Sequence, residues 1–89
     1  METKMAHMTW EEIRDAITTQ RMVILPTGAT EAHGPHLPTA VDTHQAEEMA
    51  IRVAERINAV VAPPVAYGVS KTFEHFCGTI SLSVESYQE

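Results

Sequence analysis

The stretch MVILPTGATEAHGPHLPTAVD, residues 22–42, joins a short apolar run to a loop and then to the start of an amphipathic segment. Met22 to Leu25 are continuously apolar and are followed by Pro26, a pattern typical of a parallel strand buried on both faces. Residues 26–38 contain two glycines and three prolines, so neither a helix nor a strand ladder can continue through them. The sequence therefore predicts a buried strand with a loop at its carboxyl end.

The residues after this loop predict a long helix and a second strand. From Asp42 to about Asn58, apolar residues recur at intervals of three and four positions, and charged residues lie opposite them, as in an amphipathic helix. Residues 60–62 are again apolar and predict another buried strand. The order strand, helix, strand implies a right-handed βαβ unit with a parallel sheet. The apolar positions of the helix are Ala46, Met49, Ala50, Val53, Ala54 and Ile57.

Both ends of the chain add to this unit. Thr9 and Glu12 have the spacing of a capping box and predict a short helix from about Trp10 to Thr19. Residues 80–84 alternate between apolar and polar, which predicts a half-exposed third strand, and a further covering helix is expected to begin after it. Two or three parallel strands with so few helices leave apolar faces and open edges. The sequence therefore resembles the front portion of a longer α/β domain.

Length and composition exclude several classes of protein. A chain of 89 residues forms one domain at most, and a metal, partner chains or further sequence must supplement its small core. With 44% apolar and 20% charged residues, the composition is that of a soluble globular protein. A formal charge of −6 and only 6% aromatic residues argue against nucleic acid as a partner.

The cellular compartment is also constrained by the sequence. The single cysteine, Cys77, excludes an internal disulfide and fits a reducing environment. The apolar run at residues 59–67 is interrupted by two prolines and is too short to cross a membrane, and no signal peptide is visible. We therefore expect a cytoplasmic protein without a membrane partner.

Four side chains that can bind a metal or transfer a proton lie within twelve residues, at the end of the first predicted strand. Ligands of open α/β sheets bind at the carboxyl ends of strands. Glu31 and His33 point the same way in an extended segment, and Asp42 returns at the start of the long helix. Carboxylate and imidazole ligands without thiolate suit zinc, manganese or a similar divalent ion. The four candidates are Glu31, His33, His36 and Asp42.

Simpler interpretations of the same residues remain open at this point. Asp42, with Gln45 three positions later, has the pattern of a helix cap that needs no metal. His33 and His36 can be loop histidines that bond to backbone carbonyls, and Glu31 can be a solvated charge. His75 and Cys77 are two residues apart and suggest a thiol nucleophile with a base, but a free cysteine is more often a small buried apolar residue.

Two motifs carry a resemblance to a known family. The first is GATEAHGPHLP at residues 28–38, with Asp42 behind it, and the second is APPVAYGVS at residues 62–70, followed by His75 and by GTISL at residues 78–82. In residue type, spacing and order they resemble the creatininase (creatinine amidohydrolase) family. The resemblance covers nearly the whole chain.

The resemblance implies a hydrolase with two metal ions on a three-layer α/β fold with a mainly parallel sheet. Such proteins are usually cytoplasmic homo-oligomers, often hexamers, and they cleave carbon–nitrogen bonds in cyclic or linear amides with a metal-activated water. At the matching positions, Glu31 would bind one ion, His33 the other, and Asp42 would bridge both. Zinc is the expected metal and manganese the alternative. His36 and His75 would lie around the metals or against the substrate.

The family's members are much longer than this chain, and their remaining ligands lie in a later segment with an Asn-Gly-His core. Residues 1–89 are thus expected to be the N-terminal part of a single domain without an internal boundary. Such a chain carries about half of the site and is expected to be inactive alone. Its expected partners are a small amide substrate and either further copies of itself or the missing C-terminal portion. The alternatives are a catalytically inactive truncated or structural subunit, or one piece of a split amidohydrolase.

Overall fold

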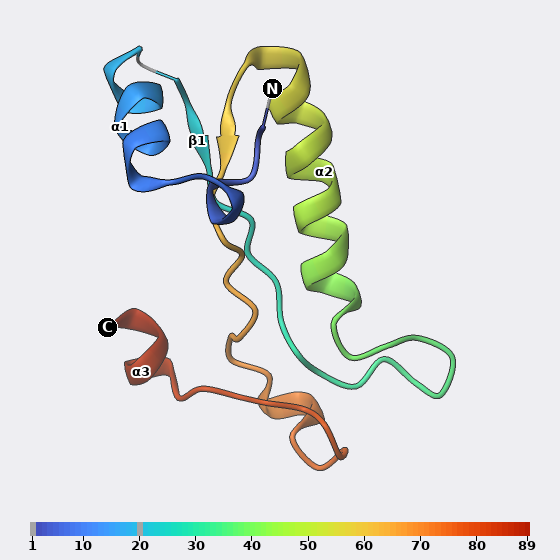
Figure 1. The fold of residues 1–89 in the computed structure, drawn as a ribbon. Helices are drawn as coiled ribbons and strands as arrows, with labels where there is room; N and C mark the ends of the chain where they lie inside the picture. The colour runs from blue at the N-terminus through green and yellow to red at the C-terminus, as the bar shows by residue number, and fades with distance from the viewer. Residues whose placement is uncertain (1, 20) are drawn as a thin grey trace.

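The structure, a computed structural model, describes residues 2–19 and 21–89 (Figure 1). Two longer helices flank a pair of short strands, and a C-terminal segment extends beyond them. In chain order the elements are η1 (Met5–His7), α1 (Trp10–Thr18), β1 (Val23–Ile24), α2 (Val41–Ile57), β2 (Val60–Val61), η2 (Lys71–Phe73) and α3 (Val84–Gln88).

The strands β1 and β2 are parallel and are connected through α2, which confirms the predicted βαβ unit. Val23 lies opposite Val60, and Ile24 lies opposite Val61. The backbone N–H of Val60 donates to the carbonyl of Met22 at 2.9 Å. On its other side β2 meets the N-terminal segment, where the N–H of Val61 donates to Thr3 at 2.6 Å. One edge of β1 therefore stays unpaired within the described residues.

Small side chains let α2 approach β2 closely. Ala50, Ala54, Ala59 and Val61 form the buried core, and Ile24 and Ile51 pack against it. The helix ends at Asn58, whose left-handed backbone (φ 56°) is tolerated by asparagine, and whose N–H donates to the carbonyl of Ala54. The amphipathic pattern thus becomes a helix that buries its alanine side against the strand.

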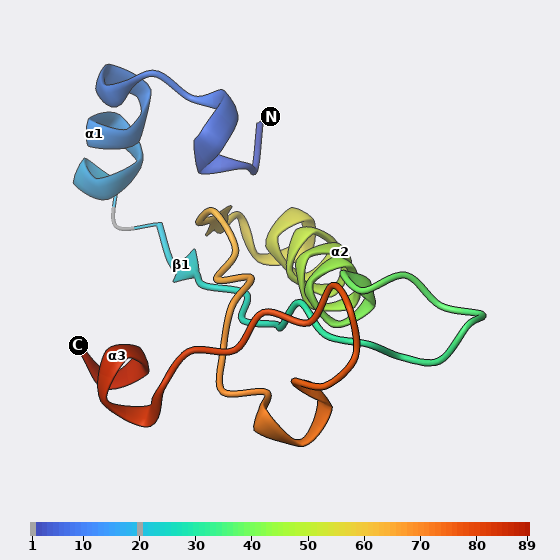
Figure 2. The ribbon, with the colours of Figure 1, turned by 90° about the horizontal axis from the view of Figure 1, so that it is seen from below.

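The helix α1 lies on the other side of the strands, so that α1, the sheet and α2 form three layers (Figures 1 and 2). A small cavity of about 30 Å³ separates α1 from the strands and is lined by Ile13, Ala16, Val23 and Val60 among others. The predicted capping box begins α1, since the N–H of Glu12 donates to Thr9 Oγ1 at 3.2 Å and the N–H of Thr9 donates to Glu12 Oε1 at 3.1 Å.

The prediction that the first strand is buried on both faces is wrong for this chain. Met22, Val23 and Leu25 are 62%, 49% and 56% exposed. Burial on both faces requires neighbouring strands and complete helical layers. Among the described residues the sheet has two strands, and α1 covers its second face only in part.

The predicted third strand is present only as isolated bridges. Ile80 pairs with Thr30 in an antiparallel bridge, and Ser81 pairs with Gly68 in a parallel one. At Val84 the prediction is wrong, because the hydroxyl of Ser83 accepts the N–H of Ser86 at 3.0 Å and caps α3 there. The helix that the sequence predicts after residue 84 is present and begins at Val84 itself. In the part of the chain that the structure describes, no helix has the length and apolar character needed to cross a membrane.

Candidate metal centre

The loop that follows β1 is held beside the segment that follows β2. The N–H of Gly28 donates to the carbonyl of Val65 at 2.8 Å, and the N–H of Val65 donates to Pro26 at 3.0 Å. The two segments stay parallel beyond the strands, with the register shifted by one residue, so that Thr27 pairs with Val65. This pairing directs the loop toward the carboxyl edge of the sheet, where ligands of α/β proteins bind.

A close contact with α2 positions the same loop against the start of that helix. A Cβ atom on Gly28 would lie 2.5 Å from the Cα of Thr43, so only glycine fits there. Thr43 is buried, and its hydroxyl donates to the carbonyl of Ala29 at 3.1 Å. Further along, the N–H of Ala32 donates to Thr79 Oγ1 at 2.9 Å. The loop is thus fixed on both sides of Glu31.

Three of the predicted ligands meet at this point. His33 Nε2 lies 3.0 Å from Asp42 Oδ2 and 3.5 Å from Glu31 Oε1. One ligand atom of each residue lies within 4.8 Å of the others, and all three residues are partly buried. Glu31 and His33 come from the loop, and Asp42 comes from the first turn of α2. The structure therefore brings together side chains from the loop after β1 and from the start of α2, the two segments in which the sequence analysis placed the candidate ligands.

The donor set fits a divalent cation. Two partly buried carboxylates converge, and within the described residues neither has an ion pair with a lysine or an arginine. His33 alone, if protonated, could offset only part of their charge. Oxygen and imidazole ligands at such a spacing suit zinc or manganese. Among the described residues, Glu31, His33 and Asp42 therefore form a group that could hold a metal.

The alternative in which Asp42 caps the long helix is wrong. The N-cap of α2 is Ala40, and no side chain forms a capping bond there. The helix begins one residue before Asp42, which places this carboxylate inside the first turn and leaves it free to face His33. The charge of Asp42 still suits the positive end of the helix dipole.

His36 and His75 are not brought into the cluster. Both are exposed, His36 in the loop and His75 in the turn after η2. The ring of His36 lies beside Gly34, whose φ of 76° turns the loop. Cys77 is free and exposed, so the interpretation of this cysteine as a buried apolar residue is wrong. The turn that carries Cys77 is exposed throughout, because no helix or strand among the described residues covers residues 71–78.

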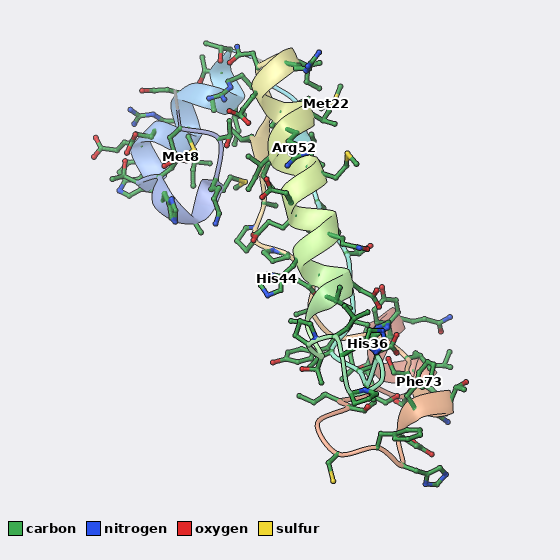
Figure 3. The ribbon with its side chains drawn as sticks, turned by 90° about the vertical axis from the view of Figure 1, so that its right-hand side faces the viewer. Met8, Met22, His36, His44, Arg52 and Phe73 are labelled. Atoms are coloured by element: carbon green, nitrogen blue, oxygen red, sulfur yellow. The ribbon has the colours of Figure 1, made fainter. Side chains whose placement is uncertain are left out.

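Sequence reasoning missed Phe73. Its ring stacks on the ring of His33, with centroids 6.4 Å apart and an angle of 29° between the planes. Figure 3 shows Phe73 at the same end of the molecule as His36, beyond the first turn of α2. The spacing of residues within the first motif contains no signal for this contact. Phe73 and His33 also line one cleft of about 520 Å³, together with Ala32, Gly34, Pro35, Phe76 and Cys77.

The fold and the cluster define a class: an α/β protein with a cluster of carboxylate and imidazole side chains beyond the carboxyl end of its first strand. The family model described as creatinine amidohydrolase matches residues 6–89. The chain belongs to the creatininase family.

Relatives of this chain carry three different names. It is 47% identical over 73 residues to a mycofactocin precursor peptide peptidase of Mycolicibacterium smegmatis, a match that covers 75% of this chain and 30% of the relative. It is 41% identical over 82 residues to a 3-dehydro-scyllo-inosose hydrolase of Thermotoga maritima, covering 90% and 26% of the two chains. A creatinine amidohydrolase of Pseudomonas putida is 38% identical over 81 residues, with coverage of 84% and 31%.

Solved creatininase structures share the fold. A manganese form of creatininase superposes with a TM-score of 0.90 at 34% identity, covering 97% of this chain and 36% of that one. A mutant creatininase of the zinc–zinc type gives a TM-score of 0.89 at the same identity and coverage. The chain thus spans about a third of the length of the relatives that it matches.

Proposed function

We propose that this chain carries part of the metal centre of a hydrolase that cleaves carbon–nitrogen bonds in cyclic or linear amides. The observation that supports the proposal most directly is the convergence of Glu31, His33 and Asp42 beyond a strand end, where no lysine or arginine among the described residues pairs with the carboxylates. Membership of the creatininase family supplies the reaction class. The relatives' names mention a precursor peptide, an inosose and creatinine, so the particular substrate is a separate question.

Each of the three residues has a proposed role. Glu31 would hold one divalent ion, His33 would hold the other, and Asp42, in the first turn of α2, would contribute to both. When bound, the ions supply a water that is activated near neutral pH and polarise the amide carbonyl. The chain's own contribution is to hold the three ligands in place through the contacts of the loop with Thr43 and Thr79. Zinc is the proposed metal, with manganese as the alternative, because creatininases of both forms are known.

His36 and His75 are proposed to contact substrate at the rim rather than metal. Each adjoins residues that line the cleft beside the cluster: His36 follows Pro35, and His75 precedes Phe76. Both are exposed and outside the group of converging ligand atoms. Their location therefore favours contact with the substrate over binding of a metal ion.

Activity is proposed for the complete domain rather than for these residues alone. The chain spans about a third of its relatives, and we infer that residues 1–89 belong to a single domain whose remaining ligands lie in further sequence. On this proposal the isolated chain is inactive. A cytoplasmic location and assembly with further copies complete the proposal, and the free, exposed thiol of Cys77 suits a reducing compartment.

Metal titration tests the proposal. Asp42→Asn keeps the shape of the side chain and its ability to bond to His33 but removes the charged ligand. We expect it to weaken zinc binding by about 100-fold in calorimetry, since even groups that only support a ligand contribute 10–100-fold. The matched control is Asp15→Asn, an exposed carboxylate on α1 outside the cluster, which should leave the affinity unchanged. Equal zinc affinity of the Asp42 variant and the unaltered chain would refute the proposed centre.

A further inference from the structure

An apolar cleft adjoins the candidate metal centre and shares a residue with it. The loop after β1 supplies one wall, from Ala32 to Pro35, and the turn that includes η2 supplies the other, with Phe73, Phe76 and Cys77. The cleft has a volume of about 520 Å³, within the usual range for small-molecule sites. His33 belongs to both the cleft and the ligand cluster. A molecule bound at the cluster therefore has this cleft beside it.

The lining of the cleft is apolar except at His33, the residue that it shares with the ligand cluster. Apart from His33, its side chains come from alanine, glycine, proline, phenylalanine and cysteine, and no charged residue lines it. Phe73 is 37% exposed and Phe76 is 59% exposed, so both rings have surface left to bury. The stacking of Phe73 on His33 places one of these rings directly beside a proposed ligand. The cleft thus combines aromatic surface with one of the proposed metal ligands, His33.

We propose that this cleft receives an apolar substituent of the amide substrate, an aryl or branched alkyl group, and that Phe73 and Phe76 determine this specificity. The inference rests on the proposed amide hydrolysis, since it places the amide group at the cluster. Aromatic rings attract apolar and aryl groups through buried area and ring stacking. A polyhydroxylated substituent would lose its hydrogen bonds with water against these rings without gaining new ones. The substrate class is therefore an amide with an apolar group next to the bond that is cleaved.

Fluorine NMR with the metal-free chain tests the cleft without any need for activity. The probes are 4-fluorophenylacetamide and fluoroacetamide, which share the amide group and differ in the aryl group. We expect the aryl amide to bind at least about tenfold more tightly, because it buries additional apolar area. On the chain itself, the backbone amides of residues 32–34 should shift when the aryl amide is added.

Variants then assign the binding to the two rings. Phe73→Ala and Phe76→Ala should each weaken binding of the aryl amide by about tenfold, the effect of losing most of a ring contact. Phe73→Leu keeps an apolar side chain and should restore most of the affinity. Tyr87→Ala, which removes an exposed aromatic ring on α3 outside the cleft, should have no effect.

The outcomes separate this inference from the proposed function. If zinc binds as predicted but both probes bind equally, the apolar cleft is wrong and the metal centre stands. If the aryl amide binds through Phe73 and Phe76 but zinc does not bind, the cleft stands as an apolar ligand site and amide hydrolysis at the cluster is wrong. If the amides of residues 32–34 shift with protein concentration and not with the probe, the cleft is a contact between copies of the chain, which overturns the inference.

Discussion

Gly28 determines how closely the loop after β1 approaches the start of α2. The space between this residue and Thr43 is too small for a Cβ atom. The contact, together with the bond from Thr43 to Ala29, sets the distance between the loop ligands and Asp42. A single glycine thus affects the geometry of the proposed metal centre. Glu31 and His33 follow it by three and five residues in the same loop, and Asp42 lies on α2.

We predict that Gly28→Ala lowers the free energy of unfolding by about 1–3 kcal/mol, the usual cost of forcing an extra group into a packed site. It should also weaken zinc binding, because the displaced loop separates Glu31 and His33 from Asp42. Chemical denaturation and calorimetry would measure the two effects. Gly68→Ala is the matched control, since a Cβ at that glycine would meet its nearest neighbour at an ordinary 3.7 Å. Equal losses in both variants would contradict the steric explanation.

The residues of the site were predictable to different degrees. Glu31, His33 and Asp42 could be named from the sequence because their types and spacing suit a metal and match a family motif. Spacing alone did not separate a capping role of Asp42 from a ligand role, since both suit a carboxylate at a helix start, and only the family resemblance favoured the ligand. Phe73 could not be found, because its contact with His33 joins segments that are far apart in the chain.

At the scale of elements, α2 is the best predicted feature of the chain. Its periodic apolar positions fall within the observed helix, and the alanines among them explain its short distance from β2. Ala54 is fully buried, whereas Val53 next to it is 41% exposed. The side of α2 that faces the strand has therefore no room for a larger residue.

We predict that Ala54→Leu destabilises the chain by about 1–3 kcal/mol, since the larger side chain would push α2 away from β2. Thermal unfolding followed by circular dichroism would measure this change. Val53→Leu adds apolar volume on the same helix at a partly exposed position and should change stability by less than about 0.5 kcal/mol. A stable Ala54 variant would show that the interface between α2 and β2 is looser than the structure indicates.

The short strands were harder to predict than the helices. Residues 22–25 and 60–62 were recognised as strands from their apolar runs, but the observed strands contain two residues each. A strand is defined by its partners, and a sheet of two strands pairs few residues. The segment at residues 80–84 alternates correctly but meets separate partners, Thr30 and Gly68, instead of one neighbouring strand.

The whole molecule is more extended than a complete domain of its length. Its radius of gyration is 15.3 Å, whereas a compact chain of this length would have about 12 Å. Figure 2 shows the C-terminal segment and α3 reaching away from α1 and α2. Large apolar side chains along and near β1 stay exposed, namely Ile17, Met22, Val23 and Leu25. The unpaired edge of β1 therefore combines open backbone groups with apolar surface.

We predict that the isolated chain associates with itself through this edge. Leu25→Lys should weaken the association by about tenfold or more, because a lysine at a strand edge opposes pairing and the buried area of the leucine is lost. Sedimentation velocity over a range of concentrations would measure the change. Gln88→Lys adds the same charge on exposed α3 and should leave the association unaltered. A chain that stays monomeric at high concentration would contradict the prediction.

The sequence by itself determined the order of α1, β1, α2 and β2, the start of α1, the extent of α2 to within one residue and the choice of the three proposed ligands. These features depend on residues that are close in the chain, where spacing, capping and backbone preference act directly. Only the tertiary structure decided that β1 is exposed, that Asp42 faces His33 without capping its helix, and that Phe73 closes a cleft beside the cluster. Those outcomes depend on distances between separate segments, which packing sets and which no local pattern encodes.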